Sequence, residues 1–125
     1  MSEFQAGKRS LEIFKRDQEH MAPGLQSIAL FSQLAMSHGD GCVLTDADGR
    51  EYLDFVAGVA VASLGAAHPH YVDRMREQLE KIVYASFASE NRAKYLELLA
   101  SVMPGNLKQI QLYSGGAESV EASFR

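Results

Sequence analysis

The segment from Ile110 to Arg125 constrains the fold of this chain more than any other. Residues 110–113 alternate weakly and favour a short β-strand, whereas Gly115 and Gly116 permit a turn that residues with a Cβ resist. Glu118 then suits the first turn of a helix, because an acidic side chain there opposes the positive end of the helix dipole. A strand, a turn and a helix start in this order direct free backbone N–H groups at one point, which favours a bound phosphate. A plain strand-to-helix turn that binds nothing has the same spacing.

Composition limits the classes of protein to which the chain can belong. Its 125 residues are near the commonest size of one domain, and 22% charged and 46% hydrophobic residues are ordinary for a globular protein. The net charge of −4 argues against nucleic acid or an anionic membrane as the main partner. Cys42 is the only cysteine, so no internal disulfide can form and a reducing, cytoplasmic compartment fits. The polar N-terminus predicts no signal peptide, and the longest apolar stretch, residues 55–67, is too short to cross a bilayer.

Two short β-prone runs flank a turn rich in Asp and Gly. Residues 42–45 and 51–54 surround residues 46–50, so the sequence predicts a β-hairpin with Gly49 in the left-handed conformation. The same turn is similar to part of a calcium-binding EF-hand loop. Such a loop needs a closing glutamate, and residues 55–57 are apolar where it would stand, so the hairpin is the preferred interpretation.

Helical periodicity predicts three elements outside the opening segment. Residues 10–19 form a brief amphipathic helix that needs a surface to lie on. Residues 71–83 form a second, and Ser89 caps a third that runs to about Val102 and should be more deeply buried, because its apolar stripe is wider. With a strand at residues 109–113 and a helix after it, this order is the start of an α/β sheet domain.

Two further stretches have more than one interpretation. Residues 55–67 are small and apolar, which lets the chain pass close to a ligand or to another subunit. His68 and His70 flank Pro69 at a spacing that can indicate a metal ion. No third ligand is near in the sequence and Pro69 suits the first turn of a helix, so we interpret both histidines as structural and expect no metal site.

Three motifs follow one another along the chain. They are Tyr52-Leu53-Asp54-Phe55 with Gly58-Val59-Ala60-Val61, then Leu64-Gly65-Ala66-Ala67-His68-Pro69, then Ser114-Gly115-Gly116-Ala117-Glu118 with Val120-Glu121-Ala122. Over residues 40–125 they resemble the N-terminal part of a class III pyridoxal-phosphate-dependent aminotransferase, the family of the ornithine, acetylornithine and 4-aminobutyrate aminotransferases. The second motif is similar to the family's Gly-His-x-His-Pro, and the third to its Asn-Ser-Gly-Thr/Ala-Glu.

Two positions depart from the family pattern. Ala66 stands where the family usually has the first histidine of its second motif, and Gly115 stands where it usually has serine. Residue 115 therefore offers no hydroxyl to a phosphate, although Ser114 can offer one from the preceding position. The backbone donors that the family draws from its Gly and Thr/Ala fall here on Gly116 and Ala117.

The resemblance implies a fold and an activity. The fold is α/β, the front of a fold type I enzyme, with an N-terminal hairpin segment over residues 1–68 and the start of the large cofactor-binding domain over residues 69–125. The activity is transfer of an amino group from an amino donor to a keto acid or aldehyde through pyridoxal 5′-phosphate. The cofactor's phosphate lies at residues 114–117, Val59 and Phe87 lie near the substrate, and the enzyme is a homodimer.

The resemblance also implies that most of the chemistry lies outside these residues. In the family, the lysine that binds the cofactor, the aspartate at its ring nitrogen and the aromatic residue stacked on its ring all come later in the chain. Lys108 is the lysine closest in sequence to the turn, yet six extended residues put it roughly 20 Å from Ser114. We therefore expect a front fragment of a longer polypeptide with no catalytic residue among its five lysines, Lys8, Lys15, Lys81, Lys94 and Lys108. The alternatives are a small non-catalytic module that binds phosphate or another anion, and a non-catalytic interaction domain.

Overall fold

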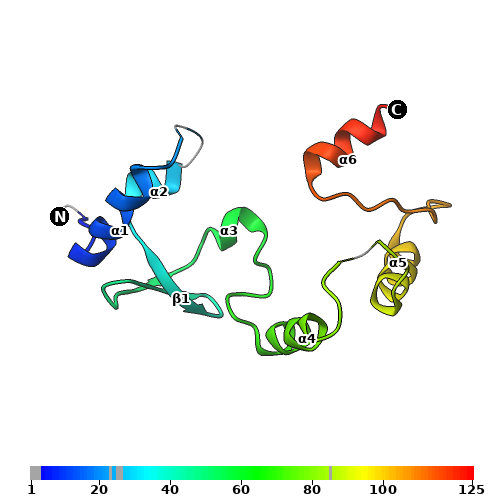
Figure 1. Cartoon of the computed structure of the whole chain (residues 1–125), viewed down its shortest axis with the longest axis horizontal. Coiled ribbons are helices and arrows are strands. Elements are labelled where there is room, and N and C mark those ends of the chain that lie inside the picture. The colour runs from blue at the N-terminus through cyan, green and yellow to red at the C-terminus, as the bar shows by residue number, and fades with distance from the viewer. Residues whose placement is uncertain (1–3, 23, 25–26, 85) are drawn as a thin grey trace. The chain divides into compact units, whose positions relative to one another are not determined.

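The computed structural model describes residues 4–22, 24, 27–84 and 86–125. By their contacts these residues form two compact units, Met1–Glu80 and Lys81–Arg125. The first unit holds three strands and four helices, which are α1 (Lys8–Gln18), α2 (Ser27–Ser32), β1 (Met36–Asp40), β2 (Val43–Asp46), β3 (Glu51–Leu53), α3 (Ala57–Ala60) and α4 (Pro69–Leu79) (Figure 1). The second holds α5 (Glu90–Val102) and α6 (Gly116–Ser123). The domain boundary expected after residue 68 stays a prediction.

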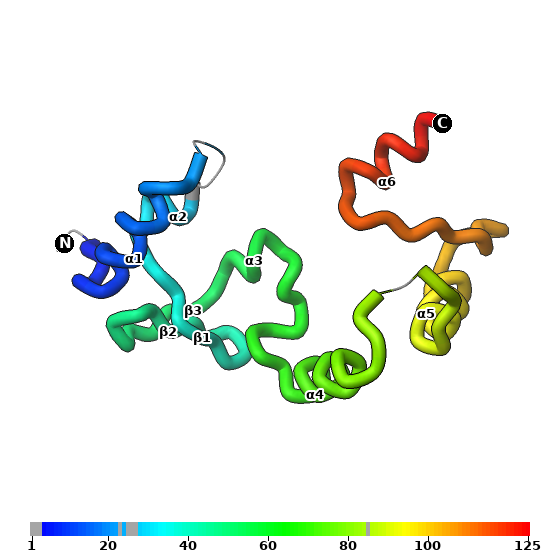
Figure 2. The backbone as a smooth tube through the Cα atoms, in the orientation of Figure 1, coloured from blue at the N-terminus to red at the C-terminus, as the bar shows by residue number. Residues whose placement is uncertain are grey.

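The three strands of the first unit form one antiparallel sheet in the order β1-β2-β3 (Figure 2). The predicted hairpin is confirmed: Val43 pairs with Leu53, and Gly49 in the connecting turn has φ = 80°. Strand β1 extends the hairpin on its other side through a turn at Gly41, where φ is 54°. The sequence did not predict β1, because residues 37–40 are polar or glycine and have low strand propensity.

A buried carboxylate shapes the hairpin turn. Asp46 is 2% exposed, and its Oδ1 accepts hydrogen bonds from the backbone N–H groups of Asp48 (2.9 Å) and Arg50 (2.8 Å). Its Oδ2 accepts a third from the Tyr52 hydroxyl at 2.8 Å. Burial alone would raise the pKa of Asp46, but the hydrogen bonds from Arg50, Tyr52 and Asp48 outweigh it and lower the pKa.

The predicted N-terminal helix is confirmed as α1, and the hairpin turn holds it. The carboxylate of Asp48 accepts hydrogen bonds from the backbone N–H groups of Arg9 (2.9 Å) and Ser10 (2.8 Å), in the first turn of α1. Gly7 precedes the helix without a side-chain cap, and a Cβ on Gly7 would overlap with the same carboxylate. The hydrogen bond from Ser10 does most to lower the pKa of Asp48, and the one from Arg9 lowers it further.

Two helices begin where the sequence predicted. Pro69 occupies the first turn of α4 and His68 is its N-cap residue, which confirms the helix-start interpretation of this segment. Ser89 caps α5, since its Oγ accepts a hydrogen bond from the backbone N–H of Arg92 at 3.3 Å. A serine at this position satisfies one N–H group that the helix itself leaves unpaired.

Of two predictions for the second unit, one is wrong and one is confirmed. Residues 109–113 are outside any sheet, because a strand exists only with a hydrogen-bonding neighbour and no described residue of this unit forms one. The expectation that α5 is more deeply buried than α4 is confirmed: Leu96, Leu99 and Ala100 of its apolar stripe are half-buried, whereas Leu79 of α4 is 60% exposed. The rest of the wide stripe is uncovered by the described residues of this unit, since Leu98 is 66% exposed and Val102 is 70% exposed.

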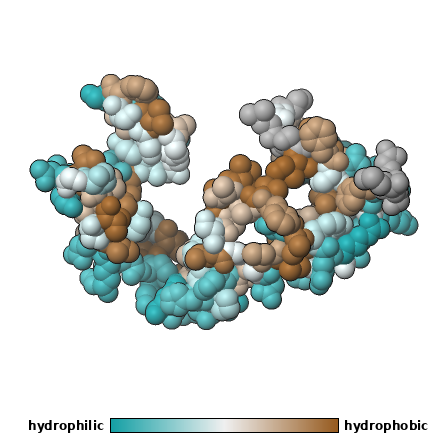
Figure 3. Space-filling model, turned by 180° about the vertical axis from the view of Figure 1, so that it is seen from behind, coloured by the Kyte–Doolittle hydropathy of each residue, from teal (hydrophilic) through white to brown (hydrophobic). Residues whose placement is uncertain are grey.

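Among the described residues, Ala6 is the sole buried apolar side chain. Large apolar side chains of α4, α5 and α6 are exposed instead, including Leu79, Tyr95 and Val120, and so is Phe124 just after α6. Figure 3 shows such apolar residues at the surface, in brown. Within the described part of the chain, no helix is both long enough and apolar enough to cross a membrane.

Candidate functional site

The glycine turn leads directly into helix α6. Gly115 is the N-cap residue, with the extended conformation φ = −154° and ψ = 170°, and α6 begins at Gly116. The carbonyl oxygen of Gly115 accepts hydrogen bonds from the backbone N–H (3.2 Å) and the hydroxyl (3.0 Å) of Ser119. The predicted turn and helix start are therefore confirmed as local structure.

The first N–H groups of α6 are free to bind an anion. A helix offers no internal acceptor to its first N–H groups, and no described residue accepts a hydrogen bond from Gly116 or Ala117. A Cβ on Gly116 would meet no atom within 4 Å, so space lies open beside these donors, and Ser114 is exposed next to them. Free donors, open space and the positive end of a helix fit a phosphate group.

One carboxylate lies close to the turn. A Cβ on Gly115 would stand 2.7 Å from Oε2 of Glu118, so the Glu118 side chain folds back toward residue 115. An acidic residue in the first turn of a helix interacts favourably with the positive end of the helix dipole. In this conformation the Glu118 side chain fills the space beside residue 115 and leaves the space beside Gly116 open.

The two residues expected near a substrate lie in different units. Val59 belongs to α3 in the first unit and is 72% exposed, whereas Phe87 precedes α5 in the second unit and is 74% exposed. No hydrogen bond, ion pair or ring contact of the described residues joins Phe87 to residues 114–117. The structure thus brings together the residues of the turn, while the roles of Val59 and Phe87 stay predictions.

Sequence reasoning missed Asp54, which organises the segment that carries Val59. Its Oδ1 accepts hydrogen bonds from the backbone N–H groups of Val56 (2.9 Å) and Ala57 (2.8 Å). An aspartate whose side chain bonds to backbone N–H groups two and three residues later is a common turn-forming arrangement. The signal was present in the sequence as an aspartate at the end of a strand, but it was assigned to the hairpin alone.

The described residues contain no cluster of three or more His, Cys, Asp or Glu side chains that could hold a metal ion. His68 and His70 lie at the start of α4.

The comparison with known families decides the family of this chain. A model of the family "Aminotransferase class-III" matches residues 27–125. The chain belongs to the class III aminotransferases. Its predicted resemblance is confirmed, and the match includes both the segment around Val59 and the turn at residues 114–117.

Relatives of this class III chain carry consistent names. The acetylornithine aminotransferase of Bifidobacterium longum is 42% identical over 95 residues, which are 72% of this chain and 22% of that protein. The acetylornithine aminotransferase of Methanopyrus kandleri is 37% identical over 89 residues, 70% of this chain and 23% of that protein. This class III chain therefore spans about a quarter of the length of the curated relatives that it matches.

Solved structures confirm the predicted fold class. An (S)-enantioselective omega-transaminase from Thermomicrobium roseum superposes with a TM-score of 0.76 at 31% identity, covering 90% of this chain and 27% of that one. An omega-transaminase from Sphaerobacter thermophilus gives a TM-score of 0.79 at 25% identity, covering 94% of this chain and 27% of that one. The class III chain thus has the fold of one part of a transaminase.

Proposed function

We propose that the whole protein carrying these residues is a pyridoxal-phosphate-dependent aminotransferase. It moves an amino group from an amino donor to a keto acid or aldehyde. The observation that supports this function best is the pair of free N–H groups, those of Gly116 and Ala117, at the start of α6 in a class III chain. They offer a ready-made site for the 5′-phosphate of the cofactor.

Residues 114–117 hold the cofactor by its phosphate. The N–H groups of Gly116 and Ala117 donate to phosphate oxygens, the hydroxyl of Ser114 adds a side-chain donor, and Gly115 lets the chain turn without a side chain in the way. Hydrogen bonds to a charged oxygen are stronger than those between neutral groups. When bound, pyridoxal phosphate supplies the electron sink for the reaction, and the protein orients it.

Val59 and Phe87 are proposed to contact the substrate. Both side chains are largely exposed and apolar, so they are available to pack against the carbon chain of an amino donor. The named relatives are acetylornithine aminotransferases and omega-transaminases. A donor with an amino group at the end of a carbon chain is therefore the first class to test.

We propose further that the protein is a cytoplasmic homodimer with no nucleic-acid partner. The exposure of Phe55 (92%) and Val61 (79%) within the apolar stretch of residues 55–67 supports partial burial of this stretch by a second subunit. The single cysteine, Cys42, supports the cytoplasmic compartment. The net charge of −4 supports the absence of a nucleic-acid partner. Residues 1–68 would form the N-terminal segment and residues 69–125 the start of the large domain. Light scattering that gives a monomer at working concentration would contradict the dimer.

The activity is tested on the whole protein loaded with pyridoxal phosphate. Amino donors with terminal amino groups are incubated with 2-oxoglutarate or pyruvate, and the glutamate or alanine formed is measured. We expect amino transfer to at least one acceptor, and its loss when the cofactor is removed. A protein that binds pyridoxal phosphate but transfers no amino group would instead be an anion-binding module.

A further inference from the structure

The segment between β3 and α4 is a loop, and both of its ends are hydrogen-bonded to the turn between β1 and β2. At its start the backbone N–H of Asp54 donates to the carbonyl of Cys42 at 2.9 Å. At its end Gly41 and Ala66 exchange two backbone hydrogen bonds of 2.9 and 2.8 Å. Gly65 has φ = 82°, and a Cβ there would stand 2.9 Å from the backbone of Gly41. The base of the loop is therefore fixed on the β1–β2 turn.

The tip of this loop is a left-handed helical turn. The φ angles of Ala57, Gly58, Val59 and Ala60 are 48°, 62°, 64° and 63°. Backbone hydrogen bonds from Ala60 to Val56 and from Val61 to Ala57, both 2.9 Å, close the turn. Glycine adopts this conformation freely, but an L-residue pays for it, and a β-branched residue such as Val59 is a genuine outlier there.

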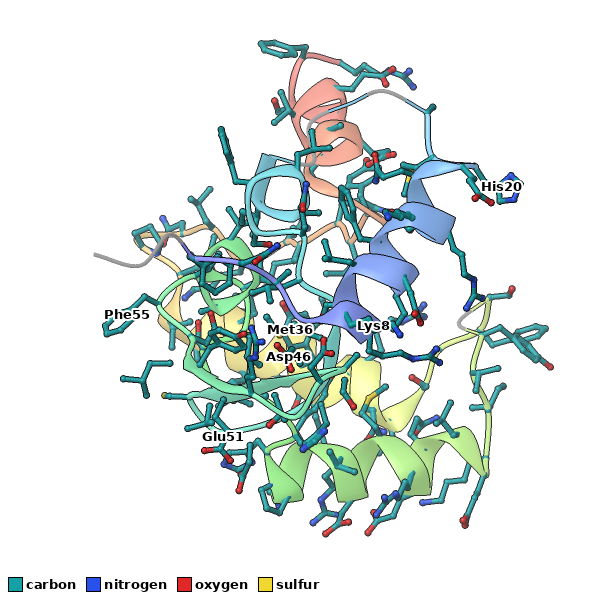
Figure 4. All side chains as sticks on the ribbon, turned by 90° about the vertical axis from the view of Figure 1, so that its left-hand side faces the viewer. Lys8, His20, Met36, Asp46, Glu51 and Phe55 are labelled. Carbon is teal, nitrogen blue, oxygen red and sulfur yellow. The ribbon has the colours of Figure 1, made fainter. Side chains whose placement is uncertain are left out.

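Burial within the described part of the chain does not compensate for this strain. Val59 is 72% exposed and Val61 is 79% exposed. Phe55, at the start of the loop, is 92% exposed and projects away from the ribbon in Figure 4. The residues that follow the turn instead line, with His68 and Tyr71, a hollow of about 470 Å³ in the same unit. Strained backbone kept without packing is a feature of ligand-facing segments.

One carboxylate accepts the hydrogen bonds that begin the turn. Asp54 Oδ1 accepts from the N–H groups of Val56 and Ala57, the residues just before and at the first left-handed position. A charged acceptor strengthens both bonds. Asp54 is also the residue whose own N–H is fixed to the sheet. Asp54 therefore fixes the start of the left-handed turn relative to the sheet.

We propose that Asp54 is a positioning residue, whose carboxylate keeps Ala57–Ala60 left-handed so that Val59 faces the substrate. This inference rests on the proposed aminotransferase function. This role accounts for the strained residue: a glycine would adopt this conformation without strain, but only a residue with a side chain, such as Val59, can contact the substrate from this position.

Two kinds of variant of the whole protein test this role. Asp54→Ala removes the acceptor, and we expect KM for the amino donor to rise about tenfold or more, since small misplacements of a positioning group have large effects. Asp54→Asn keeps an oxygen acceptor and should restore most of the wild-type KM, which also covers the case in which Asp54→Ala does not fold. Asp73 is an exposed aspartate of α4, so Asp73→Asn makes the same chemical change outside the loop. This matched control should leave KM unchanged.

Val59→Gly gives a readout that does not depend on activity. Glycine relieves the left-handed strain, so we expect the thermal midpoint to rise by about 2 °C, while KM for the donor rises as well. A purely structural loop would show a lower midpoint in Asp54→Ala with KM at the wild-type value, and that result would overturn the inference. Unchanged KM in both Asp54→Ala and Val59→Gly would do the same. If the wild type transfers no amino group, the proposed function fails, and the inference with it.

Discussion

At the scale of single residues, the turn at residues 114–117 carries one departure from the family pattern, and the backbone there does not require it. Gly115 stands where the family usually has serine, and its backbone is extended, a conformation that any residue adopts. The nearest obstacle to a side chain is Oε2 of Glu118, the end of a flexible side chain that can rotate away. A serine at residue 115 is therefore compatible with this backbone.

Gly115→Ser should tighten the binding of pyridoxal phosphate. The added hydroxyl gives the phosphate another donor, and a hydrogen bond to a charged group contributes about 1.5–3 kcal/mol, so the Kd should fall by about tenfold. Gly115→Ala is the matched control, because it displaces Glu118 without adding a donor. Ser114→Ala should raise the Kd by a similar factor. A Kd for Gly115→Ser equal to that of Gly115→Ala, measured by absorption titration of the whole protein, would show that residue 115 does not face the phosphate.

At the scale of elements, α1 depends on a carboxylate from another element. Its own N-cap residue, Gly7, provides no side-chain acceptor, and Asp48 of the hairpin turn supplies one for the N–H groups of Arg9 and Ser10. An eleven-residue helix is marginal alone in water. The formation of α1 is therefore coupled to its contact with the hairpin.

Asp48→Asn should loosen α1 and leave the hairpin intact. The turn itself uses the backbone N–H of Asp48, which bonds to Asp46, so the substitution leaves that bond in place. It removes the charge and replaces one of the two oxygens that accept from α1 with an NH2 group, which cannot accept a hydrogen bond. Hydrogen exchange over residues 8–18 of the whole protein should accelerate by about tenfold or more, while exchange over residues 43–53 stays constant. Asp73→Asn serves as the control for the change in net charge. Equal exchange of residues 8–18 in wild type and Asp48→Asn would contradict the coupling.

The same contact should depend on pH in a definite direction. The hydrogen bonds from Ser10 and Arg9 hold the pKa of Asp48 below its usual value of 3.8. A carboxyl group with a lowered pKa stabilises the folded state above the unfolded pKa, and this contribution is lost as the pH falls through the lowered value. The difference in unfolding free energy between wild type and Asp48→Asn should thus be constant above about pH 5 and vanish in stronger acid. Urea unfolding at several pH values measures it, and a difference that grows in acid would contradict this assignment.

The sequence predicted those elements whose cause is local. Ser89 caps α5 and Gly49 turns the hairpin because the chemistry of each acts within a few residues. Strand β1 and the failed strand at residues 109–113 depend on pairing with other segments, which periodicity does not report. The left-handed turn at Val59 was not foreseeable, since a β-branched residue opposes the conformation it adopts there.

At the scale of the whole molecule, the described residues expose apolar faces that a stable protein covers. Ala6 is their one buried apolar side chain, whereas Phe31 is 88% exposed and Phe124 is 85% exposed. The chemistry of the candidate site is equally incomplete. Its phosphate donors were predictable because backbone N–H groups at a helix start follow from a short motif, but the groups that would act on a substrate are not found in that motif.

Residues 1–125 expressed alone should neither transfer amino groups nor unfold cooperatively. Burial of apolar surface is the main stabilising contribution to folding, and among the described residues Ala6 alone has a fully buried apolar side chain. Of the lysines, Lys108 donates a hydrogen bond to the carbonyl of Ala100 at 2.7 Å, away from the glycine turn in sequence. Borohydride reduction with pyridoxal phosphate, followed by peptide mapping, should give no single modified lysine. One stoichiometric adduct on a lysine of this segment, with turnover, would contradict the prediction.

The binding of pyridoxal phosphate to the whole protein and to its Gly116→Val variant tests the central claim most directly. A Cβ at residue 116 meets no atom within 4 Å, so the variant should fold normally, as circular dichroism would show. The branched side chain would occupy the space of the phosphate, and losing one donor to a charged oxygen should weaken binding by about tenfold to a hundredfold. Equal Kd values for wild type and Gly116→Val, measured by absorption titration, would show that the phosphate binds elsewhere.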